Sequence, residues 1–284
     1  MPRETLIDFF QDRIRSDETF LVYDGGYRTY RYSYNDVRCA AIHLADRFTS
    51  TGLSAGDKVI LWGDNRAEWI VAFWGCLLAR VICVPIDFRA SPKFLERVAS
   101  LVTAHIIIAD KSLNTDNLTS VDVWPLETLL SKDSTASKRQ LAIESEPTSR
   151  DLAEIIFTSG ATSEPKGVEI THGNVLANIV PVEQEITKYL KYGRPFLPLR
   201  FLNLLPLSHM FGQAMATFIP PMLNSITVFM RGFNPTDIAR QIRTQRVSVL
   251  VCVPKILDVL RKYVETHIPE TREPTENKEF FIKR

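Results

Sequence analysis

Short apolar runs alternate with segments of helical periodicity along most of the chain. Near the start, Leu6, Phe9, Phe10 and Ile14 recur at helical spacing, which predicts an amphipathic helix that packs on the protein body; membrane-surface binding is the alternative. Further apolar runs predict strands at residues 58–62, 81–86, 106–109, 154–157, 202–205, 226–230 and 247–253. Because helical patterns separate these runs, we expect an α/β fold with parallel sheets flanked by helices.

The longest apolar stretch, residues 69–86, raises the question of a membrane span. Arg80 interrupts this stretch and Pro85 ends it. A spanning helix needs about 20 predominantly apolar residues in a row. The pattern therefore favours a buried helix that leads into a buried strand.

Two other segments set the organisation of the chain. Residues 131–150 are rich in Ser, Thr, Lys and Glu, which predicts a solvated connection. Residues 174–189 and a segment beginning at Pro235 are candidate helices. No internal repeat is visible.

Composition and charge narrow the functional classes. The chain has 284 residues, more than the roughly 100–200 expected of one domain, so one large or two smaller cores are possible. It carries 34 Lys and Arg residues against 33 Asp and Glu residues, a net charge of +1. Because these charges are also spread along the sequence, no long-range field favours nucleic acid, and we exclude it as a partner.

The cysteines and the N-terminal residues indicate in which cellular compartment the protein lies. Cys39, Cys76, Cys83 and Cys252 lie among apolar neighbours without metal-binding spacing, so we expect buried free thiols in a reducing compartment. The start Met-Pro-Arg-Glu is too polar for a signal peptide, and we therefore expect a cytoplasmic protein.

A loop rich in glycine and hydroxyl groups, residues 157–168, is the strongest candidate for chemistry. It follows the apolar run that ends at Phe157, and Gly160 allows a sharp turn there. Its hydroxyl groups belong to Thr158, Ser159, Thr162 and Ser163, and its one cation is Lys166. Hydroxyls, backbone N–H groups and a lysine are suited to holding phosphate. A helix beginning at residue 174 would add its dipole to that site.

This loop differs from a Walker phosphate loop. That motif requires Gly-x-x-x-x-Gly-Lys followed by Ser or Thr. Here Lys166 precedes Gly167, and no hydroxyl residue follows to hold magnesium.

The order Thr-Ser-Gly at 158–160, Thr162, Pro-Lys-Gly-Val at 165–168 and Thr-His-Gly-Asn at 171–174 resembles the phosphate-binding motif of the adenylate-forming superfamily. This superfamily contains acyl-CoA synthetases, luciferases and peptide-synthetase adenylation domains. Residues 201–212, Phe-Leu-Asn-Leu-Leu-Pro-Leu-Ser-His-Met-Phe-Gly, resemble its next motif. Weaker similarity at 32–37 and 67–87 extends the resemblance over nearly the whole chain.

The resemblance implies ATP-dependent activation of a carboxylic acid, most similar to a fatty acyl-CoA synthetase, with ATP, Mg²⁺ and coenzyme A. Aryl, amino-acid and luciferin-type acids remain alternatives. By resemblance, His209 orients the acyl carboxylate near the α-phosphate, and Met210, Phe211 and Gly212 belong to the acyl pocket. The implied nucleotide-binding residues are Thr158, Ser159, Gly160, Thr162, Lys166 and Gly167.

Two loop positions depart from the family pattern. Ala161 stands where relatives usually have Ser or Thr, and Ser163 stands where they have Gly. The first change removes a hydroxyl, and a hydrogen bond to an ion is worth about 1.5–3 kcal/mol. We expect nucleotide binding to be weakened by these changes.

Several family motifs have no counterpart. The sequence lacks Tyr-Gly-x-Thr-Glu, which supplies the magnesium ligand of relatives, and Tyr-x-Thr-Gly-Asp, which holds ribose. We expect the N-terminal part of the domain, with a phosphate-loop region at 50–190, a second region at 200–268 and a polar tail at 269–284, and we expect no C-terminal domain in this sequence. The alternatives are a non-catalytic nucleotide-binding or interaction module and one half of a split enzyme, whose other half would be a partner chain.

Overall fold

The computed structural model describes residues 3–115, 118, 121–131, 134, 147–158 and 165–267. Its strands are β1 (Thr19–Asp24), β2 (Thr29–Ser33), β3 (Lys58–Gly63), β4 (Ile82–Asp87), β5 (Ile106–Ala109), β6 (Asp122–Pro125), β7 (Leu152–Thr158), β8 (Lys166–Thr171), β9 (Arg200–Asn203), β10 (Ile226–Met230) and β11 (Val249–Val251). They form two sheets, in the orders β11-β9-β10-β1-β2 (sheet A) and β6-β5-β3-β4-β7-β8 (sheet B). All pairings are parallel except β1–β2 and β7–β8.

Helices cover both sheets. The α-helices are α1 (Leu6–Arg13), α2 (Tyr34–Ser50), α3 (Ala67–Leu78), α4 (Pro92–Val102), α6 (His172–Gly193), α7 (Met210–Gln213), α8 (Ile219–Met222), α9 (Pro235–Thr244) and α10 (Pro254–His267). Short 3-10 turns lie at Leu126–Thr128 (η1) and Arg194–Phe196 (η2), and a π-helical turn (η3) spans Ala214–Phe218. The α/β class with helix-flanked parallel sheets is thereby confirmed.

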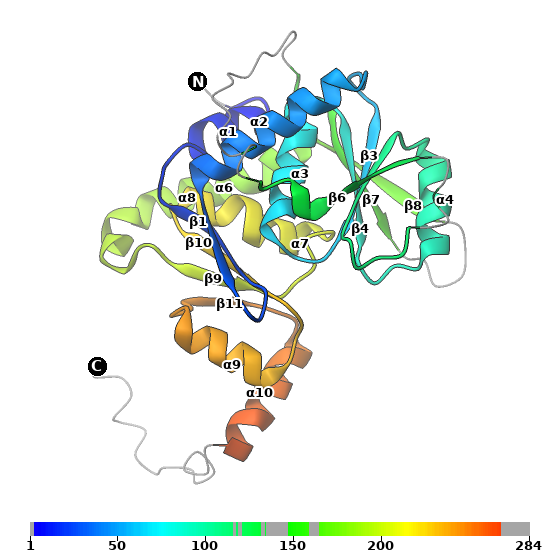
Figure 1. The fold of residues 1–284 in the computed structure, drawn as a ribbon. Coiled ribbons are helices and arrows are strands. Elements are labelled where there is room, and N and C mark those ends of the chain that lie inside the picture. The colour runs from blue at the N-terminus through cyan, green and yellow to red at the C-terminus, as the bar shows by residue number, and fades with distance from the viewer. Residues whose placement is uncertain are drawn as a thin grey trace.

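Alternating side chains divide the core into layers. In β3, Val59 and Leu61 belong to the cluster that contains α2 and α3, whereas Ile60 and Trp62 face the cluster that contains α4. Val22 and Val228 of sheet A belong to a third cluster, which contains Ile238 of α9. Sheet B thus lies between α3 and α4, and sheet A between α3 and α9 (Figure 1).

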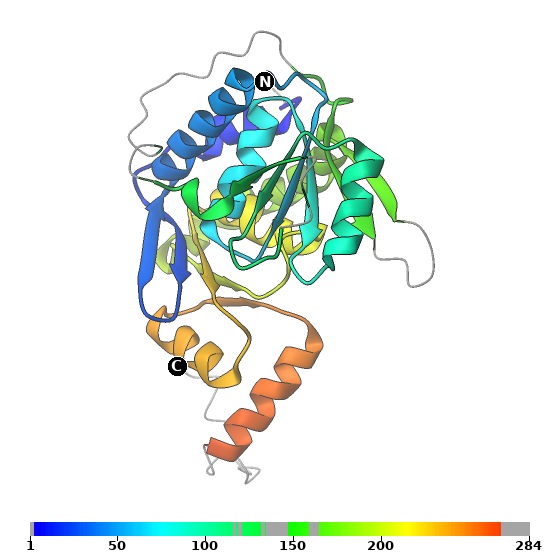
Figure 2. The ribbon, with the colours of Figure 1, turned by 45° about the vertical axis from the view of Figure 1, so that its right-hand side comes forward.

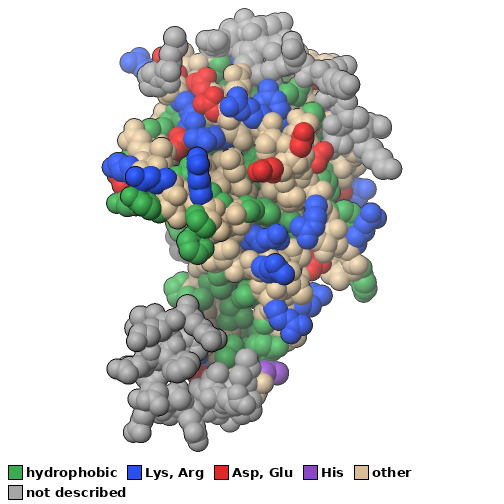
Figure 3. All heavy atoms as spheres, turned by 90° about the vertical axis from the view of Figure 1, so that its left-hand side faces the viewer, with side chains coloured by type: hydrophobic (Ala, Val, Ile, Leu, Met, Phe, Trp, Pro, Cys, Tyr) green, Lys and Arg blue, Asp and Glu red, His purple; other side chains and the backbone are tan. Residues whose placement is uncertain are grey.

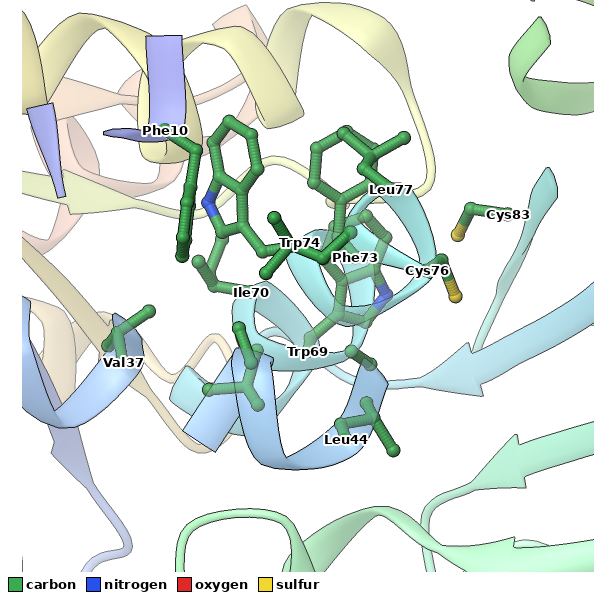
Figure 4. Packing of buried hydrophobic residues seen from close by; sticks show 14 of the residues in the cluster. Phe10, Val37, Leu44, Trp69, Ile70, Phe73, Trp74, Cys76, Leu77 and Cys83 are labelled. Atoms are coloured by element: carbon green, nitrogen blue, oxygen red, sulfur yellow. The ribbon is translucent and has the colours of Figure 1, made fainter. Parts of the chain in front are cut away.

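Helix α3 is the centre of the molecule. All of its residues are buried, as the apolar stretch at 69–86 predicted. Trp74 stacks on Phe9. Its ring centroid also lies 5.1 Å from that of Phe10 and 5.4 Å from that of Phe73 (Figure 4). Within the part of the chain that the structure describes, no helix is long and apolar enough to cross a bilayer.

The first helix packs on the body, as predicted. Thr5 caps α1 in a reciprocal hydrogen-bond pair with Asp8, which fixes where the helix begins. Leu6, Phe9 and Phe10 are fully buried, so α1 has no apolar face left for a membrane.

Strand predictions were most accurate inside the sheets. The runs at 106–109 and 226–230 coincide with β5 and β10, whereas the run at 202–205 is shifted to β9 and the run at 247–253 shrinks to β11. β9 ends at Asn203 because its side chain accepts from Leu205 N–H and donates to Gly212 C=O, which turns the chain out of the sheet. The strands β1, β2, β6 and β8 were not predicted.

The predicted regions correspond to the sheets unevenly. Residues 50–190 contain every strand of sheet B, whereas residues 200–268 supply only β9, β10 and β11 of sheet A. β1 and β2 come from before residue 50. Most of the predicted solvated connection at 131–150, and all of the tail at 269–284, lie outside the described residues.

The cysteine prediction is correct for two residues. Cys76 of α3 and Cys83 of β4 are buried, and their side chains lie near each other (Figure 4). Cys39, within α2, and Cys252, directly after β11, are only half-buried, contrary to the prediction. All four are free thiols.

The far end of sheet A is thinly covered. β11 is an edge strand, and α10 extends away from the body in both ribbon views (Figures 1 and 2). No residue of α10 is buried, and the exposed apolar side chains at this end are Val253, Leu257, Val259 and Val264. An unpaired strand edge beside apolar side chains favours association.

We therefore expect the isolated chain to bind hydrophobic dyes and to self-associate. Leu257→Glu combined with Val264→Glu should reduce both without lowering the melting temperature, because neither side chain is buried. Leu101→Glu, at an isolated exposed position on α4, is the control and should change neither. A monodisperse wild-type monomer that binds no dye would contradict this expectation.

Candidate active site

A cavity of about 430 Å³ lies at the carboxyl ends of the neighbouring strands β4 and β7. In α/β sheets this edge is where ligands commonly bind. The cavity is lined by Pro85, Ile86, Asp87, Arg89, Ala90, Ser91, Phe94, Phe157, Ser208 and His209. It therefore brings Phe157, the first residue of the predicted phosphate loop, together with the predicted catalytic histidine.

His209 stands at the rim of this cavity. It precedes α7, and its C=O accepts a hydrogen bond from Gln213 N–H, which starts the helix. Its side chain is 58% exposed, and its Nε2 lies 3.7 Å from Asp87 Oδ2. The imidazole is thus oriented by a carboxylate and open to a ligand.

Asp87 is held mainly by Arg89. Burial alone would raise the pKa of Asp87, but hydrogen bonds and charge from Arg89, together with His209, outweigh burial and lower this pKa. Arg89 donates to Asp87 over 2.9 and 2.7 Å. Asp87 is therefore a carboxylate at neutral pH, and it faces Nε2 of His209.

Asn65 fixes the segment that carries His209, and the sequence analysis did not identify it. Its Nδ2 donates to Leu205 C=O at 2.7 Å, and its Oδ1 accepts from Leu207 N–H at 2.9 Å. Asn65 is buried just before α3. A buried amide that satisfies both backbone groups of a turn holds it in one conformation. No spacing rule in the sequence would have identified this residue.

The predicted acyl-pocket residues do not line this cavity. Met210 packs partly buried against the central core, and Phe211 is 64% exposed. At Gly212 an added Cβ would lie 2.3 Å from Pro206 C=O, so this glycine is needed for close packing of α7 against the preceding turn. The assignment of these residues to an acyl pocket stays a prediction.

The phosphate-loop residues divide into two groups. Thr158 is the last residue of β7, whereas Ser159, Gly160 and Thr162 lie outside the described residues. Lys166 and Gly167 were expected within the loop, but they are the first residues of β8, opposite Thr158 and Phe157. The antiparallel ladder therefore places Lys166 at the base of the loop.

The helix predicted at 174–189 is confirmed as part of α6, but the expectation that its N-terminus adds its dipole to the phosphate site was wrong. α6 begins at His172, after the whole of β8, and His172 N–H donates to Asp151 C=O at the start of β7. Its N-terminus is thus at the opposite end of the β7–β8 pair from the loop. Burial lowers the pKa of His172 to about 4, and its Nδ1 accepts from Leu6 N–H, so this histidine is a neutral structural residue.

A larger cavity, of about 590 Å³, lies near Arg66, but no predicted site residue lines it. Arg66 forms ion pairs with Glu68, Asp110 and Glu127. These pairs fix the start of α3. In the described part of the chain, no group of three or more His, Cys, Asp or Glu residues is arranged to hold a metal ion.

A buried carboxyl group joins the two motifs, and the sequence analysis gave it no role. Glu154 of β7 is fully buried, and its Oε2 accepts from Gln213 Nε2 at 3.0 Å. The other oxygens, Glu154 Oε1 and Gln213 Oε1, have no hydrogen-bond partner. Burial raises the pKa of Glu154 to about 7, although the hydrogen bond from Gln213 opposes this shift. A proton on Glu154 adds a second donor to the pair, beside the amide of Gln213, where two oxygens have no partner.

Comparison with known proteins decides the family. The family model described as AMP-binding enzyme matches residues 10–279. The chain belongs to this family. The resemblance inferred from the two motifs is confirmed, as is the assignment of this AMP-binding chain to the N-terminal part of the large domain.

Curated relatives are similar over most of this AMP-binding chain. Long chain acyl-CoA synthetase 8 of Arabidopsis thaliana is 25% identical over 84% of this chain and 37% of its own length. Crotonobetaine/carnitine–CoA ligase of Salmonella typhimurium is 28% identical over 87% of this chain and 50% of its own length. The chain therefore spans half or less of the length of these relatives.

Solved structures show the same fold. The AMP complex of O-succinylbenzoate coenzyme A synthetase from Bacillus subtilis superposes with a TM-score of 0.72 at 21% identity, covering 95% of this chain and 66% of that chain. Fatty acyl-adenylate ligase from L. pneumophila gives a TM-score of 0.67 at 22% identity, covering 87% of this chain and 44% of that chain. At this identity the likeness establishes the fold of the AMP-binding chain.

Glu154 leads to a prediction about stability. The ordinary pKa of a glutamate is 4.5, so between about pH 4.5 and 7 the folded protein keeps a proton that the unfolded chain has lost. The free energy of unfolding should therefore fall as the pH rises through this range, by roughly 3 kcal/mol in total. Glu154→Gln removes the titration, so it should be more stable than wild type at pH 8, with little difference at pH 5.

Urea unfolding of each variant at both pH values measures this effect. Variants are compared with wild type at the same pH, because His172 also makes stability depend on pH. Burial holds this histidine neutral in the folded protein, so the free energy of unfolding falls as the pH is lowered. Glu169→Gln, on an exposed site of β8, is the matched control. Destabilisation by Glu154→Gln at pH 8 would show that the ionised carboxylate is the stabilising form.

Proposed function

We propose that this chain carries the phosphate-binding and acyl-orienting part of an AMP-forming acid–thiol ligase, with a fatty acid as its substrate. The carboxylate attacks the α-phosphorus of ATP, and pyrophosphate leaves as the acyl-adenylate forms. The thiol of coenzyme A then displaces AMP to give a thioester. We place this activity in the cytoplasm. The observation that carries the proposal is the shared cavity of Phe157, Ser208 and His209.

Each predicted residue has a role in this proposal. Thr158, Ser159, Gly160, Thr162, Lys166 and Gly167 hold the β- and γ-phosphates and stabilise the leaving pyrophosphate. His209, oriented by Asp87, donates a hydrogen bond to the carboxylate of the acid. Met210, Phe211 and Gly212 form the wall on the acyl side.

Magnesium is not assigned to residues of this chain. The described residues contain no cluster of three potential ligands, and the family's Tyr-Gly-x-Thr-Glu motif is not in the sequence. We therefore assign no step to the ion here. In the complete reaction it neutralises charge on the phosphates of ATP.

A second candidate function is supported by the phosphate loop itself. Ala161 and Ser163 stand at positions where the family pattern has a hydroxyl residue and glycine. These changes favour a nucleotide-binding module without catalytic activity, or a half that works with a separately encoded partner. Either would retain phosphate binding without turnover.

We expect the 284-residue chain to form little or no acyl-CoA by itself. Each missing electrostatic contact to a transition state commonly costs about two to three powers of ten in rate. The test supplies ATP, Mg²⁺, coenzyme A and fatty acids of several lengths, and follows pyrophosphate and AMP. Turnover at the rate of an ordinary synthetase would show that other residues replace the missing motifs.

We expect Lys166 to be the main phosphate contact that remains. Lys166→Ala should weaken the binding of ATP or pyrophosphate by about 1.5–3 kcal/mol, the worth of a hydrogen bond to a charged group. Thr162→Ala should have a smaller effect. Lys188→Ala, on α6, is the matched control and should have none. Calorimetric titration measures the affinity of all three variants. Equal affinities of wild type and Lys166→Ala would show that this loop does not bind phosphate.

A further inference from the structure

Aromatic side chains project into solvent where α6 ends. Tyr189 and Tyr192, one helical turn apart, are 66% and 68% exposed, and Phe196 in η2 is 74% exposed. Side chains three apart in a helix lie on the same side, so the two tyrosines form one stripe that continues into η2. Exposed aromatic stripes of this kind mark interaction sites.

An apolar groove runs beside this stripe. It has a volume of about 390 Å³, and among the described residues that line it, Glu185 alone is charged. The other lining residues are Ile186, Tyr189, Leu190, Gly193, Phe196, Leu197, Leu199 and Leu223. Its walls come from α6, η2 and the turn after α8. The groove therefore depends on tertiary packing and is not the frayed end of one helix.

Basic residues flank the aromatic stripe. Residues 186–200 contain Lys188, Lys191, Arg194 and Arg200, and no acidic residue. Lys188 forms an exposed pair with Glu185, and the Lys191 ammonium lies 4.7 Å from the centroid of the Tyr192 ring. Three aromatic side chains are thus accompanied by four cations, of which Lys188 is paired with Glu185 directly before the segment.

The positive charge continues onto sheet A. Burial lowers the pKa of Arg200, and the nearby cations Arg31 and Arg246 lower it further. This arginine therefore has other arginines as electrostatic neighbours. In Figure 3, which shows this side of the molecule, Lys and Arg side chains recur across the face, with hydrophobic side chains and some Asp and Glu side chains between them.

Together these features are those of an interfacial surface. At a bilayer surface, aromatic and aliphatic side chains enter the headgroup boundary while Lys and Arg bind anionic headgroups. We propose that residues 186–200, the interfacial segment, bind this protein to the surface of an anionic phospholipid bilayer. Charge complementarity selects this occupant, because cations beside an apolar stripe gain little from a neutral bilayer.

The surface lies apart from the candidate active site. The interfacial segment is at the left in Figure 1, whereas α4, whose Phe94 lines the active-site cavity, is at the right. Binding here leaves that cavity open. Since no helix in the described ranges could cross a bilayer, the contact is peripheral.

Flotation with lipid vesicles tests the proposal, because protein aggregates sink while vesicle-bound protein rises. We expect the chain to float with phosphatidylcholine vesicles that contain about one-third phosphatidylglycerol, and to float weakly with phosphatidylcholine alone. High salt should release it. Lys191→Glu combined with Arg194→Glu, and separately Tyr189→Ser combined with Tyr192→Ser and Phe196→Ser, should each weaken partitioning at least about tenfold.

Matched controls distinguish this segment from general charge and exposure. Tyr27→Ser removes a fully exposed tyrosine elsewhere, and Lys93→Glu combined with Arg97→Glu reverses two exposed charges on α4. Both controls should partition like wild type. Equal flotation on neutral and anionic vesicles, or equal losses in the controls, would overturn the proposal.

A single-residue reporter gives a second measurement. The four native tryptophans are buried, so Phe196→Trp introduces one exposed indole. Its emission should shift to the blue on anionic vesicles and be quenched by nitroxide-labelled lipids. The contrary outcome is an emission that shifts to the blue without lipid as the protein concentration rises. The segment would then bind a second copy of the chain, and the bilayer assignment would be wrong.

Discussion

Burial of α3 on every side is the constraint on which the rest of the structure depends. A helix without a polar face must be enclosed, and here two sheets and the helices α1 and α2 enclose it. The contact with α2 is so close that a Cβ at Gly75 would lie 2.6 Å from Leu44 Cδ2. At this position packing therefore outweighs the roughly 1 kcal/mol by which alanine exceeds glycine in helix propensity.

The placement of the candidate site follows from the same helix. Asn65, just before α3, holds the turn that leads to His209, and Arg66 fixes the first turn of α3 through three carboxylates. β4 follows α3 directly, and its carboxyl end supplies Asp87. Two motifs far apart in sequence thus reach one cavity because both are attached to the layer around α3.

The sequence predicted those elements whose apolar pattern reflects burial. β5 and β10 are buried throughout, as is α3, and their hydrophobic runs gave nearly correct bounds. β2 and β8 were missed because they are exposed antiparallel edge strands, where polar residues are expected and no apolar run marks the strand. This is also why Lys166 was placed in the loop. This reason does not apply to β1, which was also missed, because Phe20, Leu21 and Val22 form a buried apolar run.

The Glu154–Gln213 pair could not be recognised from sequence because its partners become neighbours only through the tertiary fold. A polar pair in a core is commonly no more stabilising than apolar residues of the same volume. A hydrogen-bonded pair does, however, fix the two segments that carry it in one relative position, whereas apolar contacts allow the segments to slide. Glu154 shares β7 with Thr158, and Gln213 lies one helical turn after His209. The hydrogen bond between them therefore sets the position of the loop strand relative to the histidine, at the point where the two halves of the site meet.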